Sequence, residues 1–525
     1  MRDFHKPGRS AVHAMNGMCA TSHPLAAGVA VDILKAGGNA VDAAIAGAVL
    51  LGFCEPQMTG LGGDCFVLLK PPGREDVIAL NGSGRAPAAL DAGAFRAQGL
   101  TAIPIRGIEA VTVPGAVDAF CRLSADWGKL GLAASLAPAI HYAEQGIPVA
   151  ARVASDWAEA ADSLKGAARD TLLVGGQAPR EGQIFRAPQQ AQALRRIAEQ
   201  GRAGFYEGEV AADMVAALRA LGGQHTLEDF ANTACTLGDP VTGTYQGRDL
   251  LEHPPNGQGA TAILLLNILS HFDIARLDPF GADRAHLEAE ATKLAYDARD
   301  RFVADPAHMT RLDHMLSPGT AARLAALIDP ARAMPAAAPL TEAVHRDTIY
   351  ITVVDRDRMA VSLIYSVYWS FGSGFASDRF GINFQNRGAG FTLAQGHPNE
   401  AAAGKRPMHT IIPAMVRMGG RVTMPYGVMG GAYQPCGHAR ILSNMADFGM
   451  APQDAIDAPR CFSDADGFKI ERGYAPQVAA DLAARGHPVV EADVPLGGAQ
   501  AILIHDGGTL EGGSDPRKDG CALGY

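Results

Sequence analysis

One dipeptide of the sequence, Asp347-Thr348, lies where a chain cut would create a catalyst. It follows residues 329–342, whose many Ala and three Pro residues predict an exposed, flexible connector. A threonine at a new amino terminus carries a hydroxyl nucleophile and an α-amine whose ordinary pKa of about 7.7–8.0 suits it to accept that hydroxyl's proton. The pattern therefore indicates attack on an amide bond without a separate histidine. A plain strand start would show the same dipeptide.

The segment after Thr348 is predicted to form a β-hairpin. Residues 349–354 and 359–366 have strand composition and are separated by a polar turn at 355–358. If this four-residue turn determines the register, the residue numbers of two cross-strand partners add up to about 713. Ser366 then lies close to Thr348. Ser366 is then either a second hydroxyl beside the nucleophile or an ordinary strand hydroxyl exposed to solvent.

Other elements that must position this hairpin follow from periodicity and turn residues. Residues 24–36 and 40–53 are predicted to be helices. The glycine-rich loop 59–64 precedes a predicted strand at 65–69, whereas a phosphate-binding loop lies between a strand and a helix. We therefore interpret this loop as a tight turn. From about 108 to 327, helical patterns dominate.

Composition and charge argue against several functions. The 525-residue chain has a net charge of -10 and no run of Lys or Arg, so nucleic acid is not an expected partner. The longest apolar run, residues 43–54, is shorter than the about 18 residues of a membrane span, and no secretory signal is recognised, so we expect a cytoplasmic protein without a membrane partner. The eight scattered Cys lack zinc-site spacing, and neither a metal nor another cofactor is expected.

Six motifs together resemble the gamma-glutamyltransferase family. They are GGNAVDAA at 37–44, EPQMTGLGGD at 55–64, DTIYITVVD at 347–355, FGSG at 371–374, KRPMHTIIP at 405–413 and GVMGG at 427–431. The resemblance implies an α+β fold, namely a four-layer αββα sandwich of the N-terminal-nucleophile hydrolase type. It also implies self-cleavage into a large subunit, residues 1–347, and a small subunit, residues 348–525, which form a heterodimer or a dimer of heterodimers.

The resemblance assigns roles to individual residues. Thr348 corresponds to the threonine that attacks the carbonyl of Asp347 and afterwards that of the substrate. Ser366 corresponds to a second hydroxyl that hydrogen-bonds the nucleophile. Gly430 and Gly431 correspond to the pair whose backbone amides form the oxyanion hole. Without the resemblance, this glycine pair would be interpreted as a plain turn.

Two segments that bind the glutamyl head group in the family are altered here. The position of the arginine that holds the α-carboxylate falls on Ser83, and Arg85 lies two residues away. The segment 386–391 keeps its first and last residues but has Ala389 and Gly390 where two acids would be. An arginine–carboxylate pair and an acid–ammonium pair are strong orienting contacts, and their loss argues against a glutamyl substrate.

Four more residues are predicted to contact the substrate. Asn386 and Arg387 begin the altered segment, and His409-Thr410 replaces the family's serine pair. Arg85 or Arg387 remains a candidate for binding an anion. His409 either polarises the substrate or fills a polar pocket.

Three functions compete. The first is a self-processing amidase or acylase acting on a small non-glutamyl amide, because residues 432–438 resemble the branch with oxamate amidohydrolase and cephalosporin-acylase-like members. The second is a gamma-glutamyltransferase or glutathione hydrolase that uses other head-group contacts. The third is an unprocessed pseudoenzyme acting as a binding protein, suggested by Tyr368 where related chains often carry Asn.

Overall fold

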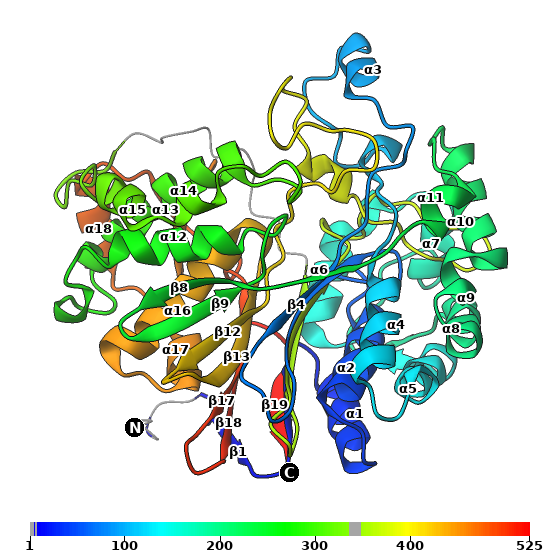
Figure 1. Ribbon diagram of the computed structural model, residues 1–525, viewed down its shortest axis with the longest axis horizontal. Helices are drawn as coiled ribbons and strands as arrows, with labels where there is room; N and C mark the ends of the chain where they lie inside the picture. The colour runs from blue at the N-terminus through cyan, green and yellow to red at the C-terminus, as the bar shows by residue number, and fades with distance from the viewer. Residues whose placement is uncertain (1–4, 6–7, 335–347) are drawn as a thin grey trace.

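The computed structural model describes residues 5, 8–334 and 348–525. Two seven-stranded sheets face each other, and helices cover the outer face of each (Figure 1). The α+β class and the αββα sandwich are confirmed. Asp347 and most of the predicted connector, residues 335–342, lie outside the described residues.

The first sheet is antiparallel and combines strands from both ends of the chain. Its strands are, in spatial order, β1 (Val12–Ala14), β18 (Leu510–Ser514), β17 (Gly498–Ile504), β13 (Arg421–Met429), β12 (Ala414–Met418), β9 (Arg248–Glu252) and β8 (Val241–Tyr245). Three of its six neighbouring pairs, β1 with β18, β13 with β17 and β9 with β12, join segments far apart in sequence, so the sheet is complete only when both ends of the chain have come together.

The second sheet contains the predicted hairpin and is also antiparallel. Its order is β19 (Cys521–Gly524), β2 (Met18–Thr21), β10 (Ile349–Val354), β11 (Ala360–Ser366), β3 (Asp64–Lys70), β4 (Ile78–Gly82) and β7 (Thr236–Gly238). The hairpin strands β10 and β11 therefore lie between β2 and β3, two strands that precede residue 347.

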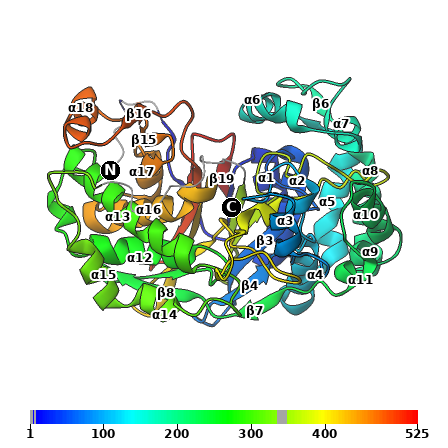
Figure 2. The same ribbon diagram turned by 90° about the horizontal axis from the view of Figure 1, so that it is seen from above.

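Helices form the outer layers (Figure 2). The second sheet is covered by α1 (Pro24–Lys35), α2 (Ala40–Cys54), α4 (Ala116–Trp127), α5 (Leu132–Gln145) and α8 (Pro188–Gln200), with α6 (Ala151–Ala160), α7 (Ala167–Leu172), α9 (Ala203–Tyr206), α10 (Gly208–Ala220) and α11 (Leu227–Ala231) beyond them. The first sheet is covered by α12 (Gly259–Leu269), α13 (Ala282–Phe302), α14 (Leu312–Leu316), α15 (Pro318–Ala325), α16 (Gln434–Phe448), α17 (Pro452–Asp457) and α18 (Pro476–Ala484). The remaining helix α3 (Ala92–Ala97) projects from the body (Figure 1).

Helix α2 shows how local sequence and packing agree. The Asn39 side chain accepts hydrogen bonds from the backbone of Val41 and Asp42, and Asp42 bonds back to the Asn39 amide, which completes a capping box. All residues of α2 are buried, because the helix packs against α1 and α5 as well as against the second sheet. The helices predicted at 24–36 and 40–53 and the strand at 65–69 are confirmed to within a few residues.

The region 108–327 is less helical than its sequence pattern indicated. It contains β7, β8 and β9, together with two short strands, β5 (Ile147–Pro148) and β6 (Ile184–Phe185). All three residues of β7 are exposed and β8 is partly exposed, so neither has the buried apolar run that marks a strand in sequence. A further small sheet joins β14 (Cys461–Asp464), β15 (Gly467–Ile470) and β16 (Val489–Glu491).

An apolar cluster joins the two sheets beside the start of β10. It consists of Phe66, Tyr350, Ile364, Ile411 and Met429, all fully buried. None of the helices in the described ranges combines the length and apolar character needed to cross a lipid bilayer.

Candidate active site

The hairpin brings two hydroxyl side chains together at one edge of the sandwich. Ile349 pairs with Tyr365, so the residue numbers of cross-strand partners add up to 714, one more than expected. This register places Thr348 opposite Ser366. Thr348 Oγ1 donates to Ser366 Oγ at 3.4 Å, and both residues are fully buried. Ser366 Oγ also accepts the backbone N–H of Tyr368 at 2.9 Å. The alternative of a solvent-exposed Ser366 is wrong, because the second sheet is covered on both faces here.

The glycine pair lies at the same end of the sandwich, between β13 and α16. Gly430 and Gly431 have φ angles of 117° and 55°, which side-chain-bearing residues rarely adopt. A Cβ on Gly430 would also lie 2.9 Å from the Cα of Gly497. The preceding strand packs on β10 so tightly that a Cβ on Gly427 would lie 2.4 Å from the Tyr350 ring. The backbone amides that follow Met429 are therefore carried on a rigid turn near the start of β10.

A glutamine holds this turn in place. Gln258 Nε2 donates to the carbonyl of Gly431 at 3.0 Å and to that of Thr410 at 2.6 Å. Its Oε1 accepts from Arg299 on α13 at 3.1 Å. Gln258 could not be recognised from the sequence, because it follows the Pro-Pro-Asn-Gly turn and has no motif of its own.

The buried carboxylate of Asp64 lies beside the two hydroxyls. Asp64 pairs with Ser366 across β3 and β11. Its Oδ1 accepts from the amides of Gly84 at 2.8 Å and Gly115 at 3.0 Å, and from Gln385 Nε2 at 2.8 Å. Burial raises the pKa of Asp64 to about 6, although nearby Arg387 and these hydrogen bonds oppose the rise. Asp64 therefore keeps its proton to a higher pH than an exposed aspartate does.

His409 bonds to the other oxygen of this carboxylate. Its Nε2 lies 3.2 Å from Asp64 Oδ2, and its ring packs 4.7 Å from that of Phe66. His409 is fully buried. Asp64 ends the motif at 55–64, but the motif alone indicates no role for it, because its contact with His409 joins residues 345 positions apart.

Arg387 and Thr410 complete the polar cluster. Arg387 Nη1 donates to Thr410 Oγ1 at 3.1 Å, and its guanidinium lies 4.0 Å above the centre of the Tyr368 ring. Both Arg387 and Tyr368 are buried. We call Asp64, His409, Arg387, Thr410 and Tyr368 the Asp64 cluster. It joins the hydroxyl pair through the Tyr368 amide, which donates to Ser366.

Asn386, next to Arg387, is bonded to backbone. Its Nδ2 donates to the carbonyl of Ile105 at 2.8 Å, and its Oδ1 accepts from the amide of Trp369 at 3.1 Å. Asn386 thus braces the loop that carries Tyr368.

Ser83 and Arg85 face a different environment from Arg387. Ser83 Oγ donates to Asn81 Oδ1 at 2.7 Å. Arg85 Nη1 bonds to Asp305 at 3.4 Å and to the Gly404 carbonyl at 3.0 Å. Arg85 lines a pocket of about 540 Å³ whose lining includes neither the hydroxyl pair nor Arg387. The structure thus brings Arg387, but not Arg85, into the Asp64 cluster.

One buried group has the residue types of a metal site. His286 and Glu290 lie one turn apart on α13, and His487 approaches from the loop after α18. Hydrogen bonds account for this group: His286 Nδ1 lies 2.7 Å from His487 Nε2, and Lys293 Nζ donates to Glu290 at 2.7 Å. Glu290 also accepts the amide of Met334 at 2.7 Å. These side chains bind the backbone of Met334, and the Lys293 ammonium disfavours a cation there.

Comparisons with known proteins match this chain over nearly its whole length. The family model described as gamma-glutamyltranspeptidase matches residues 26–525. The oxamate amidohydrolase proenzyme of Klebsiella pneumoniae is 38% identical, covering 97% of this chain and 98% of that protein. A glutathione hydrolase-like proenzyme, YwrD, of Bacillus subtilis is 37% identical with the same coverage. The crystal structure of cephalosporin acylase from Bacillus halodurans superposes with a TM-score of 0.93 at 38% identity, covering 100% of this chain and 99% of that one. The chain therefore belongs to the gamma-glutamyltranspeptidase family and is an amidohydrolase or acyltransferase of the N-terminal-nucleophile type.

Proposed function

We propose that this protein is a self-processing amidase with Thr348 as its nucleophile. The observation that carries the proposal is the contact between the buried hydroxyls of Thr348 and Ser366 on adjacent strands. In the precursor, the Thr348 oxygen attacks the carbonyl carbon of Asp347, and the bond to the Thr348 nitrogen breaks to leave an ester. The same step frees the Thr348 amine. Water then cleaves the ester, which releases the Asp347 carboxylate and restores the Thr348 hydroxyl, so that the amine can serve as the base of the mature enzyme.

The mature reaction uses the same atoms on a substrate amide. The amine takes the hydroxyl proton, the oxygen attacks the substrate carbonyl, and the amine portion of the substrate leaves from the resulting tetrahedral intermediate. The amides of Gly430 and Gly431 are proposed to bind the oxyanion, and each such donor is typically worth about 2.7–4 kcal/mol. Water, or a second amine, then releases the acyl group from Thr348.

The sheet explains why the two products of processing would stay together. The small subunit, residues 348–525, would contribute β10 and β11, which pair with β2 and β3 of the large subunit, residues 1–347. The first sheet is interleaved in the same way, because β1 pairs with β18 and β9 with β12. Separation would break both sheets, so we expect a stable heterodimer. Association of two heterodimers remains a prediction.

A non-glutamyl amide is the substrate class that we favour. Relatives named oxamate amidohydrolase and cephalosporin acylase support this choice, and the altered head-group segment argues in the same direction. A glutathione hydrolase is the second candidate, because the YwrD relative is named glutathione hydrolase-like.

A substrate panel with covalent trapping tests the proposal. Processed protein is offered small amides, glutathione and a gamma-glutamyl anilide, while the released ammonia or amine is measured. Protein quenched during turnover should carry the acyl mass on the peptide that begins with Thr348. Preferred cleavage of glutathione would favour the second candidate. Amide cleavage by Thr348→Ala would refute the assignment of the nucleophile.

A further inference from the structure

Two histidines and a glutamate meet on one face of the first sheet, at the edge formed by β1 (Figure 1). His13 of β1 is the cross-strand partner of Glu511 on β18, and Glu511 pairs in turn with Leu503 of β17. His505 lies two residues after Leu503, so the alternation of strand side chains places it on the same face. The ligand atoms of His13, His505 and Glu511 all lie within 4.8 Å of one another.

The distances within this group suit a tetrahedral transition-metal ion. His505 Nε2 lies 2.8 Å from Glu511 Oε2, and His13 Nε2 lies 3.9 Å from the same oxygen. Ligand atoms at about 2.0–2.2 Å from a zinc ion stand about 3.3–3.6 Å apart in a tetrahedron, between these two distances. The side chains of His13 and His505 are 58% and 41% exposed, so small rotations of the imidazoles reach this geometry while the strands stay in place.

The charges around Glu511 favour a cation. Its side chain is only 11% exposed, and both of its ion-pair partners within the described ranges are histidines. The buried group on α13 differs, because there the Lys293 ammonium already bonds to the carboxylate of Glu290. Two imidazoles and one carboxylate, with a fourth position left to solvent, form a ligand set that zinc takes in proteins.

The group lies at the opposite end of β10 from the hydroxyl pair. Thr348 comes just before this strand, whereas the turn at 355–358 comes just after it. Arg358 of that turn donates to the carbonyl of Met15, which follows β1, and to that of Gly508, in the turn between β17 and β18. A metal ion in this group would therefore take no part in the chemistry at Thr348.

We propose that His13, His505 and Glu511 bind one divalent transition-metal ion, with zinc as the best fit, and that the ion fastens β1 to the hairpin of β17 and β18. Strand β1 is a three-residue edge strand, which gains most from such a link. The spacing of Cys and His in the sequence could not reveal this group, because its histidines come from opposite ends of the chain. If the chain is cut as proposed, the ion also joins the large subunit to the small one, but its binding does not depend on the cut.

Metal titration of the full chain tests the site. Tag-free protein is treated with a chelator, desalted and titrated with Co²⁺, whose visible absorption reports tetrahedral coordination, and Zn²⁺ is then added as competitor. We expect one Co²⁺ per chain, displaced by an equal amount of Zn²⁺. His13→Ala and His505→Ala should each weaken binding by about 10–100-fold or more, since even the loss of a residue that only supports a ligand costs that much. His271→Ala, which removes an exposed histidine elsewhere, is the matched control and should bind like wild type.

The structural role has a readout of its own. Zn²⁺ should raise the urea midpoint of unfolding of wild type but not of His13→Ala, because an ion that binds only the folded chain stabilises it. A wild-type protein that binds no Co²⁺, or variants of His13 and His505 that bind it as tightly as wild type, would overturn the site. Equal urea midpoints with and without Zn²⁺ would overturn the fastening of β1. A chain that is never cut would refute self-processing alone, because both measurements apply equally to the uncut protein.

Discussion

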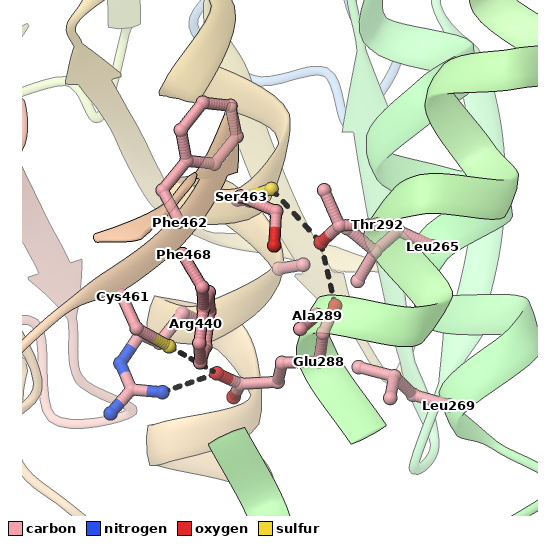
Figure 3. Close-up of a pocket in the computed structure, with 12 residues that line it drawn as sticks. Leu265, Leu269, Glu288, Ala289, Thr292, Arg440, Cys461, Phe462, Ser463 and Phe468 are labelled. Carbon is pink, nitrogen blue, oxygen red and sulfur yellow. Dashed lines mark hydrogen bonds and ion pairs between the residues drawn. The ribbon is translucent and has the colours of Figure 1, made fainter. Parts of the chain in front are cut away.

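Two carboxylates in this protein, the fully buried Asp64 and Glu288, whose side chain is 12% exposed, have opposite surroundings. Glu288 on α13 lies 2.9 Å from Arg284. It also pairs with Arg440 of α16, while Cys461 approaches from β14 (Figure 3). Burial alone would raise the pKa of Glu288, but the two guanidinium groups outweigh it and hold the pKa below its usual value. Asp64 accepts mainly uncharged donors, and its pKa is raised to about 6.

This difference in surroundings indicates that one carboxylate stabilises the fold and the other belongs to the active site. The side chains around Glu288 enclose only about 10 Å³, less than a substrate needs, and they join helices of one layer. Asp64 lies across one strand pair from Ser366. We infer that Glu288 stabilises the helical layer over the first sheet, whereas Asp64 organises the polar site.

The largest expected effect would come from removing Glu288. Glu288→Ala leaves two arginines buried without their carboxylate, which should lower the free energy of unfolding by about 3–5 kcal/mol. Urea unfolding of the variant measures this change, and kcat/KM at low temperature should remain near wild type. Glu209 is the matched control, since it also contacts two arginines, Arg196 and Arg379, but at the surface. A loss for Glu209→Ala as large as that for Glu288→Ala would contradict the structural role of burial.

A substitution in the turn at Gly430 should lower the catalytic rate but leave the stability of the helical layer over the first sheet unchanged. Gly430→Ala places a Cβ 2.9 Å from the Cα of Gly497 and requires φ of 117° from a residue with a side chain. Displacing the amides of this turn should lower kcat by about 10²–10³-fold, the usual effect of losing one oxyanion donor. Steady-state kinetics of processed protein measures it. Gly449→Ala, a left-handed position with open space at the end of α16, is the control for backbone strain alone.

The smallest effect concerns pH. The raised pKa means that folded Asp64 binds a proton below about pH 6, whereas the unfolded group does so only below about 4. Stability should therefore fall as pH rises from about 4 to 6, by at most about 1.4 kcal/mol per pH unit. Asp64→Asn should remove this fall, as seen by unfolding at each pH. Glu288, with its lowered pKa, should act in the opposite direction, stabilising above its unfolded pKa and losing that contribution as pH falls. Equal slopes for wild type and Asp64→Asn would contradict the raised pKa.

Local features of the sequence predicted the hairpin well. Strands β10 and β11 are adjacent in the chain, so the turn at 355–358 was enough to bring Ser366 next to Thr348 with an error of one residue in register. The two-sheet architecture came from resemblance alone, because its pairings, such as β1 with β18, join opposite ends of the chain. Periodicity carries no information on such long-range contacts.

The polar site could be predicted only in part for the same reason. His409 and Thr410 were recognised as site residues, but their partners Asp64 and Arg387 come from other segments. The two candidate arginines could not be separated by sequence, since both lie near altered motifs. Only the fold places Arg387 over Tyr368 and Arg85 against Asp305.

The most direct test is the intact mass of the purified protein with amino-terminal sequencing of its fragments. Cleavage after Asp347 should divide the 54.7 kDa chain into pieces of 347 and 178 residues, about 36 and 18.5 kDa, with the smaller beginning Thr-Ile-Tyr-Ile. Thr348→Ala should remain one chain. A wild-type protein that stays whole under all conditions would contradict self-processing at Thr348 and favour a binding protein without activity.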